Sequence, residues 1–254
     1  MTRKHHGVNQ TGSTPVEGLS NDYSQAGDFL IDVVGDGPTL AYATLFVEPN
    51  DWDACFPGYS PREKTCEFRV SKGTVKRVAG NKAVSIPGAP PSMAIAASSG
   101  RLAIVPADLR WGHEFHARVN GPVEIRDANT GRLSRRIQPR GEVEAVALSE
   151  AVVAVLVRQG PTLRLEVYDV RTGTRRSSVP VGAKAGPDLD AAGTVAVYSD
   201  QKAIRVLQAG KQTTSLVAIA TSEPFDLSIE GSRIAWAENL NEGREGRIQA
   251  IELH

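Results

Sequence analysis

Two histidines close together are the first candidate for chemistry. His113 and His116 lie in the run Trp111-Gly-His-Glu-Phe-His116, and with Glu114 or Asp108 they could ligate a metal. The His-Glu-x-x-His spacing that fixes two ligands on one helix face is absent, so no metal site is predicted. An exposed binding loop is the favoured interpretation, and plain surface decoration is the alternative. The predicted contact residues of this loop are Trp111, His113, Phe115 and His116.

A second loop is rich in aromatic residues and is bracketed by the two cysteines. Cys55 and Cys66 enclose a Pro- and Gly-rich stretch, and thiols at the ends of such a loop can approach to disulfide distance. We expect a disulfide that stabilises the chain by roughly 3 kcal/mol; two unpaired thiols are the alternative. A pinned loop orders its side chains at low entropic cost, which suits a protein or glycan surface. The predicted contact residues here are Trp52, Phe56 and Tyr59.

Acidic residues raise the question of catalysis. Asp32, Asp188 and Asp226 occupy equivalent places in a repeated sequence motif. Two catalytic carboxylates need different environments to divide the roles of acid and base, whereas three equivalent ones favour a shared structural task, the bonding of turn amides. Neither Gly-x-Ser-x-Gly nor Gly-x-Gly-x-x-Gly nor a P-loop occurs, so no nucleophile elbow, no nucleotide site and no cofactor is predicted.

The repeat shows which elements must position these residues. Each copy has an alternating apolar run, a tight turn and a second run of the form apolar-Ala-apolar, which is typical of a β-hairpin. The copies are Ile31–Tyr42, Met93–Ile104, Ala145–Val155, Pro187–Val197 and Phe225–Trp236. The alanines that align in them are Ala41, Ala103, Ala154, Ala196 and Ala235.

A third strand with its own turn follows the hairpin. Val123-Glu-Ile-Arg-Asp-Ala-Asn-Thr-Gly131 matches Leu165-Glu-Val-Tyr-Asp-Val-Arg-Thr-Gly173. Asp and Thr can bond the backbone of the turn, and Gly supplies a positive φ. Short strands then complete a four-stranded unit.

Repetition of this unit predicts an all-β fold, a β-propeller of about five four-stranded antiparallel blades. A β-sandwich would not repeat one four-stranded motif. The ring is either closed with five blades or part of a larger one. The propeller domain is expected at residues 29–254. Residues 1–28 form a polar segment that is either flexible or supplies a closing strand, for which residues 15–19 are the candidate.

The motifs also resemble a known family. The run Asp226–Ala235 resembles the repeat of TolB-like and WD40-like propellers, and Tyr168–Gly173 resembles the third strand of WD40 blades. The resemblance covers about residues 29–253. It implies a scaffold that binds proteins through the ends of its central channel.

Composition limits the partners. Lys+Arg and Asp+Glu are both 29, so the basic excess of a nucleic-acid binder is absent and no nucleic acid is predicted. No run of 18 apolar residues occurs, so no membrane insertion is predicted. The N-terminal residues lack the apolar region of a signal peptide, which leaves either a cytoplasmic protein or one whose leader has been removed. The cysteine pair favours an extracytoplasmic, secreted or periplasmic location, with the cytoplasm kept open.

These observations favour a non-catalytic propeller that binds a protein partner through its channel rim and its two inserted loops. A hydrolase or lyase with its site at the channel mouth is the first alternative. A carbohydrate-binding propeller is the second, and a small molecule or glycan would then be the ligand.

Overall fold

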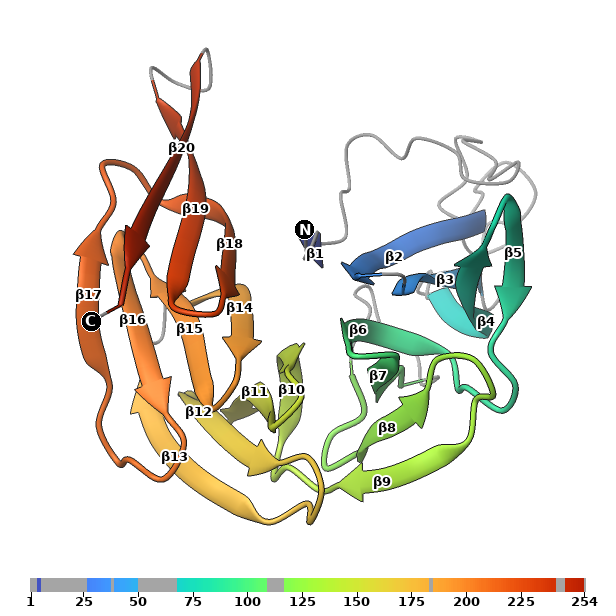
Figure 1. Ribbon diagram of the computed structural model, residues 1–254. Coiled ribbons are helices and arrows are strands. Elements are labelled where there is room, and N and C mark those ends of the chain that lie inside the picture. Colours follow the sequence, from blue (N-terminus) through green and yellow to red (C-terminus); the bar gives the residue numbers. More distant parts are fainter. Residues whose placement is uncertain are drawn as a thin grey trace, which may run out of the picture.

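The structure, a computed structural model, describes residues 4–5, 27–37, 39–49, 68–108, 117–182, 185–240 and 245–253 of the 254 (Figure 1). In this part of the chain every regular element is a β-strand. No helix within it is long and apolar enough to cross a membrane.

The strands form five antiparallel sheets, the blades, in chain order. Blade 1 contains β1 (Lys4–His5), β2 (Gly27–Asp36), β3 (Thr39–Pro49), β4 (Phe68–Ala79) and β5 (Lys82–Ser85). Blade 2 contains β6 (Ser92–Ser98), β7 (Arg101–Pro106), β8 (Val123–Asp127) and β9 (Leu133–Ile137). Blade 3 contains β10 (Glu142–Leu148), β11 (Val152–Gln159), β12 (Thr162–Asp169) and β13 (Arg175–Val181). Blade 4 contains β14 (Ala185–Ala192), β15 (Val195–Asp200), β16 (Ala203–Gln208) and β17 (Ser215–Ile219). Blade 5 contains β18 (Pro224–Glu230), β19 (Arg233–Leu240) and β20 (Glu245–Glu252).

The blades follow one another around a common axis, which confirms the predicted five-bladed β-propeller (Figure 1). The innermost strands are β2, β6, β10, β14 and β18, each followed by the second strand of its hairpin, and each of the first four contacts the inner strand of the next blade. Blades 1 and 5 face each other across the open side of the arc, and β1 pairs with β2 and also contacts β18. The segment 1–28 therefore includes a short strand between the first and last blades, whereas the candidate closing strand at 15–19 lies outside the described residues.

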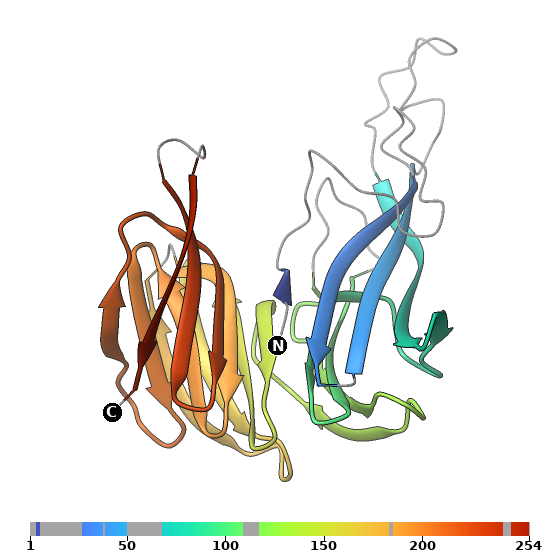
Figure 2. The same ribbon diagram turned by 45° about the horizontal axis from the view of Figure 1, so that its top comes forward.

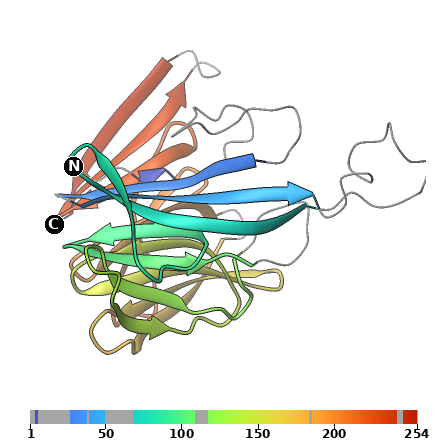
Figure 3. The same cartoon turned by 90° about the vertical axis from the view of Figure 1, so that its right-hand side faces the viewer.

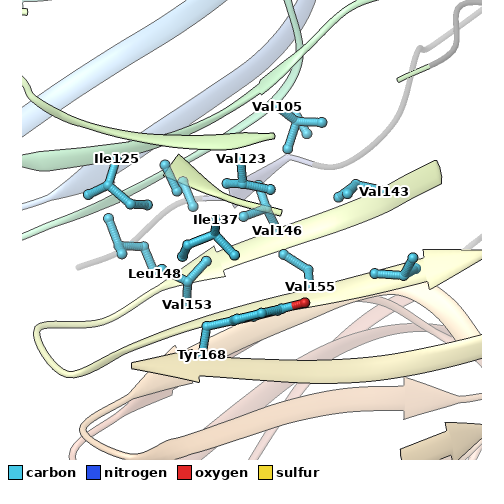
Figure 4. Packing of buried hydrophobic residues seen from close by; sticks show 14 of the residues in the cluster. Val105, Val123, Ile125, Ile137, Val143, Val146, Leu148, Val153, Val155 and Tyr168 are labelled. Carbon is cyan, nitrogen blue, oxygen red and sulfur yellow. The ribbon is translucent and has the colours of Figure 1, made fainter. Parts of the chain in front are cut away.

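Apolar residues fill the junctions between consecutive blades. The described residues form four buried clusters, one at each junction from blades 1–2 to blades 4–5. At the junction of blades 2 and 3, Val123 and Ile137 lie above Val146 and Val155 (Figure 4). Side chains alternate between the two faces of each strand. Blades 2, 3 and 4 therefore each have one set of side chains toward the preceding blade and one toward the next.

An alanine, replaced by a valine in blade 4, recurs at the same place on the face toward the next blade. It is the third residue of the strands β3, β7, β11, β15 and β19. The five residues are Ala41, Ala103, Ala154, Val197 and Ala235. The first four are fully buried, and Ala235 is half-buried because no described blade covers it. A short side chain at this position lets the next sheet approach closely.

The expected member of this set in blade 4, Ala196, is wrong. Ala196 belongs to the cluster between blades 3 and 4, whereas Val197 belongs to the cluster between blades 4 and 5. Ala192 pairs with Val195, so the hairpin turn has the same length as in the other blades and the equivalent residue is Val197. A shift of one residue along a strand moves a side chain to the opposite face.

Every inner strand contains a β-bulge near its start. The register shifts between Leu30 and Asp32, between Ser92 and Ala94, and at the corresponding places in the other three blades. An extra residue there bends the strand and increases its twist. The register is regular from each bulge to the hairpin.

The Asp-x-x-Thr-Gly turns form as predicted. Asp127 accepts hydrogen bonds from the amides of Asn129 and Thr130, at 3.0 and 2.7 Å, and from the Thr130 hydroxyl. Asp169 does the same at the matching turn. These bonds lower the pKa of Asp127, with the Thr130 amide contributing most. Gly131 has φ 72°, a conformation that side chains rarely adopt.

Two buried aspartates link neighbouring blades. Asp32 of β2 accepts a hydrogen bond from the Ile95 amide of β6 at 3.0 Å. Asp190 of β14 accepts one from the Ile229 amide of β18, also at 3.0 Å. Asp32 therefore bonds a strand amide in the next blade, and the expectation that it bonds a turn amide is wrong.

We expect Gly131→Ala to destabilise the protein more than Gly160→Ala. Both glycines have a positive φ, so each substitution should cost about 1 kcal/mol through the backbone alone. A Cβ at Gly131 would overlap the Pro87 carbonyl oxygen, whereas a Cβ at Gly160 meets nothing within 4 Å. The clash should add about 1–3 kcal/mol to the loss in free energy of unfolding, measured with urea. Equal losses would show that the Pro87 contact has no energetic weight.

Asp32→Ala should destabilise the protein by about 1–3 kcal/mol. The substitution leaves the buried Ile95 amide without this acceptor, and an unsatisfied buried amide costs its desolvation energy. Glu245→Ala, at an exposed position in β20, is the control and should change the free energy of unfolding by less than about 0.5 kcal/mol. A similar small effect of both changes in denaturant unfolding would contradict the role of this link.

Candidate functional site

The two inserted loops arise from adjacent blades. β3 and β4 pair as far as Pro49 and Phe68, and the first loop connects them in blade 1. The second loop connects β7 to β8 in blade 2 and begins and ends near the bridge between Ala107 and Ala117. The described strand ends beside these loops, at Pro49 and Phe68 in blade 1 and at Ala107 and Ala117 in blade 2, lie at the same end of the propeller, which we call the loop end.

The side chains predicted in these loops lie outside the described residues. They are Trp52, Phe56, Tyr59, Trp111, His113, Phe115 and His116, together with Cys55 and Cys66. Their contact roles and the disulfide therefore stay predictions.

A hollow of about 200 Å³ lies on the axis at the opposite end, where the five inner hairpins converge. Every blade contributes to its lining. Asp36, Ser98, Ala192 and Glu230 are the last paired residues of their inner strands, and Glu150 begins the equivalent turn in blade 3. The repeat thus brings the hairpin region of each blade to a single axial pocket, although Glu150 stands one residue later in its hairpin than the other four residues.

The lining of this pocket is acidic. Four of its residues are Asp36, Glu150, Asp190 and Glu230, and no Lys, Arg or His is among the described residues that line it. Asp36 is tied to the Ser99 amide at 2.6 Å, and the buried Asp190 to the Ile229 amide. Glu150 and Glu230 are exposed. Hydrogen bonds therefore hold the carboxylates of Asp36 and Asp190 in the wall of the pocket. The carboxylates of Glu150 and Glu230 face solvent, where a cationic group could reach them.

The site residues predicted from the sequence did not include these acidic residues. Three of them stand at or beside the hairpin turn of the quoted repeats, where they read as ordinary turn residues. Their nearness to the hairpin turn in each repeat is the signal that could have found them, since the corresponding turns of a propeller surround its axis.

A second acidic group lies nearer the loop end, between blades 4 and 5. Asp188 is 7% exposed and accepts a long hydrogen bond, 3.4 Å, from the Ser199 hydroxyl. Burial, together with the neighbouring carboxylates of Asp226 and Glu223, raises the pKa of Asp188 to about 6, against the lowering effect of the Ser199 hydrogen bond. Asp188 therefore differs in environment from Asp32, although both occupy the start of an inner strand.

The other buried carboxylates are satisfied within their own blades. Glu124 pairs with Arg126 at 2.7 Å. Glu166 pairs with Arg175 at 2.8 Å, and Glu238 with Arg247 at 2.9 Å. Such pairs neutralise the buried carboxylates within each blade. In the described part of the chain, no group of three or more His, Cys, Asp or Glu side chains is arranged to hold a metal ion.

Recurring aromatic residues do not form a carbohydrate-binding shelf. Tyr42, Tyr198 and Trp236 stand at one repeat position in blades 1, 4 and 5. All three are at most 7% exposed. A sugar needs an accessible aromatic face, so these residues serve packing.

Comparisons with known proteins bear on the fold. No protein-family model and no curated protein sequence matches the chain. The structure of Saccharomyces cerevisiae Sqt1 is 10% identical, over 89% of this chain and 72% of that chain, with a TM-score of 0.50. The computationally designed Ika8 protein is 14% identical, over 87% of this chain and 70% of that chain, also with a TM-score of 0.50. The WD40 domain of Neurospora crassa Pan2 is 13% identical, over 83% of this chain and 72% of that chain, with a TM-score of 0.48. For Sqt1 and the Ika8 protein the likeness at these identities is one of fold, and none of the three is named as a TolB-like propeller.

The raised pKa of Asp188 predicts a pH-dependent stability. A carboxyl group whose pKa is higher in the folded than in the unfolded chain stabilises the fold below the unfolded pKa, near 4, and loses that effect as pH rises through about 6. Asp188→Asn should therefore be more stable than the parent protein at pH 7.5, by ~1–3 kcal/mol, and nearly equal to it at pH 4.

Asp127→Asn serves as the control of opposite sign. The pKa of Asp127 is lowered, so its ionised form stabilises the fold, and its replacement should destabilise the protein at neutral pH. Urea unfolding of the three proteins at both pH values measures these effects. A gain from Asp188→Asn that does not change with pH would exclude Asp188 as the titrating group.

Proposed function

We propose that this five-bladed propeller is a non-catalytic interaction module that holds a basic segment of a partner protein in its axial pocket. The observation that carries this proposal is the convergence of all five inner hairpins on one acidic pocket. A concave site that excludes part of the water strengthens the attraction between its carboxylates and a Lys or Arg side chain.

The pocket is suited to binding an Arg or Lys side chain in particular. Glu150 and Glu230 present exposed carboxylates from blades 3 and 5. Ala97, Ala191 and Leu148 also line the pocket, but each is at most 7% exposed, so the accessible lining is mainly polar. Fixed carboxylates at Asp36 and Asp190 add negative potential without having to move.

The inserted loops are proposed as a second contact area at the loop end. The strands bring the two loops to adjacent blades, so their aromatic residues could act together on one partner or glycan. A disulfide between Cys55 and Cys66 would pin the larger loop and would place the protein in an oxidising compartment, secreted or periplasmic.

A hydrolase is the second candidate, and the Asp188–Asp226 pair favours it. A carboxyl group with a pKa near 6 can carry the proton that a general acid needs, while a neighbouring carboxylate acts as base. Turnover of chromogenic glycosides or esters that is lost in Asp188→Asn, in a protein that stays folded, would support this alternative.

Binding of short fluorescein-labelled peptides tests the proposed module. A peptide with two arginines should bind, and the same peptide with glutamines in their place should not. Glu150→Gln combined with Glu230→Gln should weaken binding at least about tenfold, because each replacement removes a charged partner. Binding should also weaken with added salt.

Glu245→Gln, an exposed acid in β20 outside the pocket lining, is the matched control and should leave affinity unchanged. Fluorescence anisotropy gives the dissociation constants. Equal affinity for both peptides, or equal loss in the pocket and control variants, would reject the axial pocket as the site.

A further inference from the structure

Blade 5 has a face of small and apolar residues that no described blade covers. Strand pairing aligns Ala235 with Ser228 and Ala250, and Ala237 with Asp226 and Ile248. Ala235 is half-buried, whereas its equivalents in the other four blades are fully buried. Ile248, on the same face, is 79% exposed. This face has the chemistry of a surface on which a next blade packs.

Blade 1 has the complementary face, which no described blade covers, although Tyr42 on that face is itself buried. Leu40 is the second residue of the second strand, the place of Leu102 in blade 2 and Ile234 in blade 5. Those residues are fully buried against the preceding blade, whereas Leu40 is 42% exposed. Leu40 on this face thus corresponds to the larger residue that meets an alanine of the preceding blade, as Leu102 and Ala41 do at the junction of blades 1 and 2.

Charge on the two faces is also complementary. Lys72 and Lys76 of β4 lie opposite Phe46 and Tyr42 and place their ammonium groups over those rings, at 4.4 and 5.9 Å. The side chains on the blade 5 face include three acids and one base. They are Asp226, Glu230, Glu252 and Arg233. Contact between the faces would bring opposite charges together.

We propose that two copies of this chain associate head to tail, with the uncovered face of blade 5 in one copy packed on the uncovered face of blade 1 in the other. The contact would continue the blade-on-blade packing that each chain already repeats four times. Within one chain, blades 1 and 5 stand apart on either side of β1, so neither covers the other (Figure 2).

The proposed interface is heterologous, because it joins two different faces. Such an interface either closes into a ring or continues into a longer array. In the side view, β2, β3 and β4 of blade 1 lie above blade 2 (Figure 3). A further blade added in the same direction would therefore pack on the side of blade 1 that faces away from blade 2. The second copy therefore takes the place of a sixth blade at one end of the arc.

Sedimentation velocity of the full chain, from about 1 to 200 µM, tests the proposal. The parent protein should show species larger than the monomer that grow with concentration. Ala235→Arg blocks the blade 5 face and Leu40→Arg blocks the blade 1 face, so each variant should be monomeric or at least about tenfold weaker in self-association. A mixture of the two variants should form a dimer and nothing larger, because one intact face of each kind remains.

Ile219→Arg is the control, since Ile219 is 72% exposed on β17 and lies on neither face. It should associate as the parent does. Circular dichroism and melting temperature report folding, and the exposed-site pair Ile248→Arg and Lys72→Glu repeats the test if a first variant unfolds. A parent protein that stays monomeric throughout, single variants that associate like the parent, or a mixture that stays monomeric while the parent associates would each overturn the proposal.

Discussion

Close contact between consecutive sheets is the constraint on which the rest of this structure depends. An alanine at one position of β3, β7 and β11, and a valine in β15, allows that contact, and residues of the next blade pack over it. The buried Asp32 and Asp190 add hydrogen bonds across two of the junctions. Because the inner strands are held side by side in this way, their hairpins meet at the axis and form one pocket.

Much of the fold could be predicted because its signals are local and repeated. Alternation and turn residues identified the hairpins, and the Asp-x-x-Thr-Gly motif gave the correct turn at Gly131. Ala196 was predicted at the recurring position because it is an alanine. The length of the hairpin turn fixes the register, and it places Val197 there instead. The pocket was missed for a different reason: Glu150 and Glu230 are far apart in sequence and converge only when five blades share an axis. The contact roles of the loop residues stay predictions; these residues are Trp52, Phe56, Tyr59, Trp111, His113, Phe115 and His116.

The two ends of the propeller differ in their chemistry. The hairpin end presents fixed and exposed carboxylates around one pocket, which suits a cationic group. Toward the loop end, a carboxyl group is held in a setting that opposes its ionisation at neutral pH. This carboxyl group lowers the stability of the folded chain at neutral pH. It belongs to the junction of blades 4 and 5, which the apolar cluster of those blades stabilises. Stability and recognition are thus distributed over different parts of the same inner strands.

The bulge in every inner strand has a consequence for how such a chain can change over time. In blade 4 the irregular stretch runs from Ala185 to Leu189, longer than in the other blades, yet the ladder from Leu189 to Ala192 keeps the common pattern. Each bulge therefore accommodates differences in the length of the chain that precedes it, without changing the strand pairing that follows. Insertions and deletions before a blade can accumulate there during evolution, while the geometry around the axis is inherited intact.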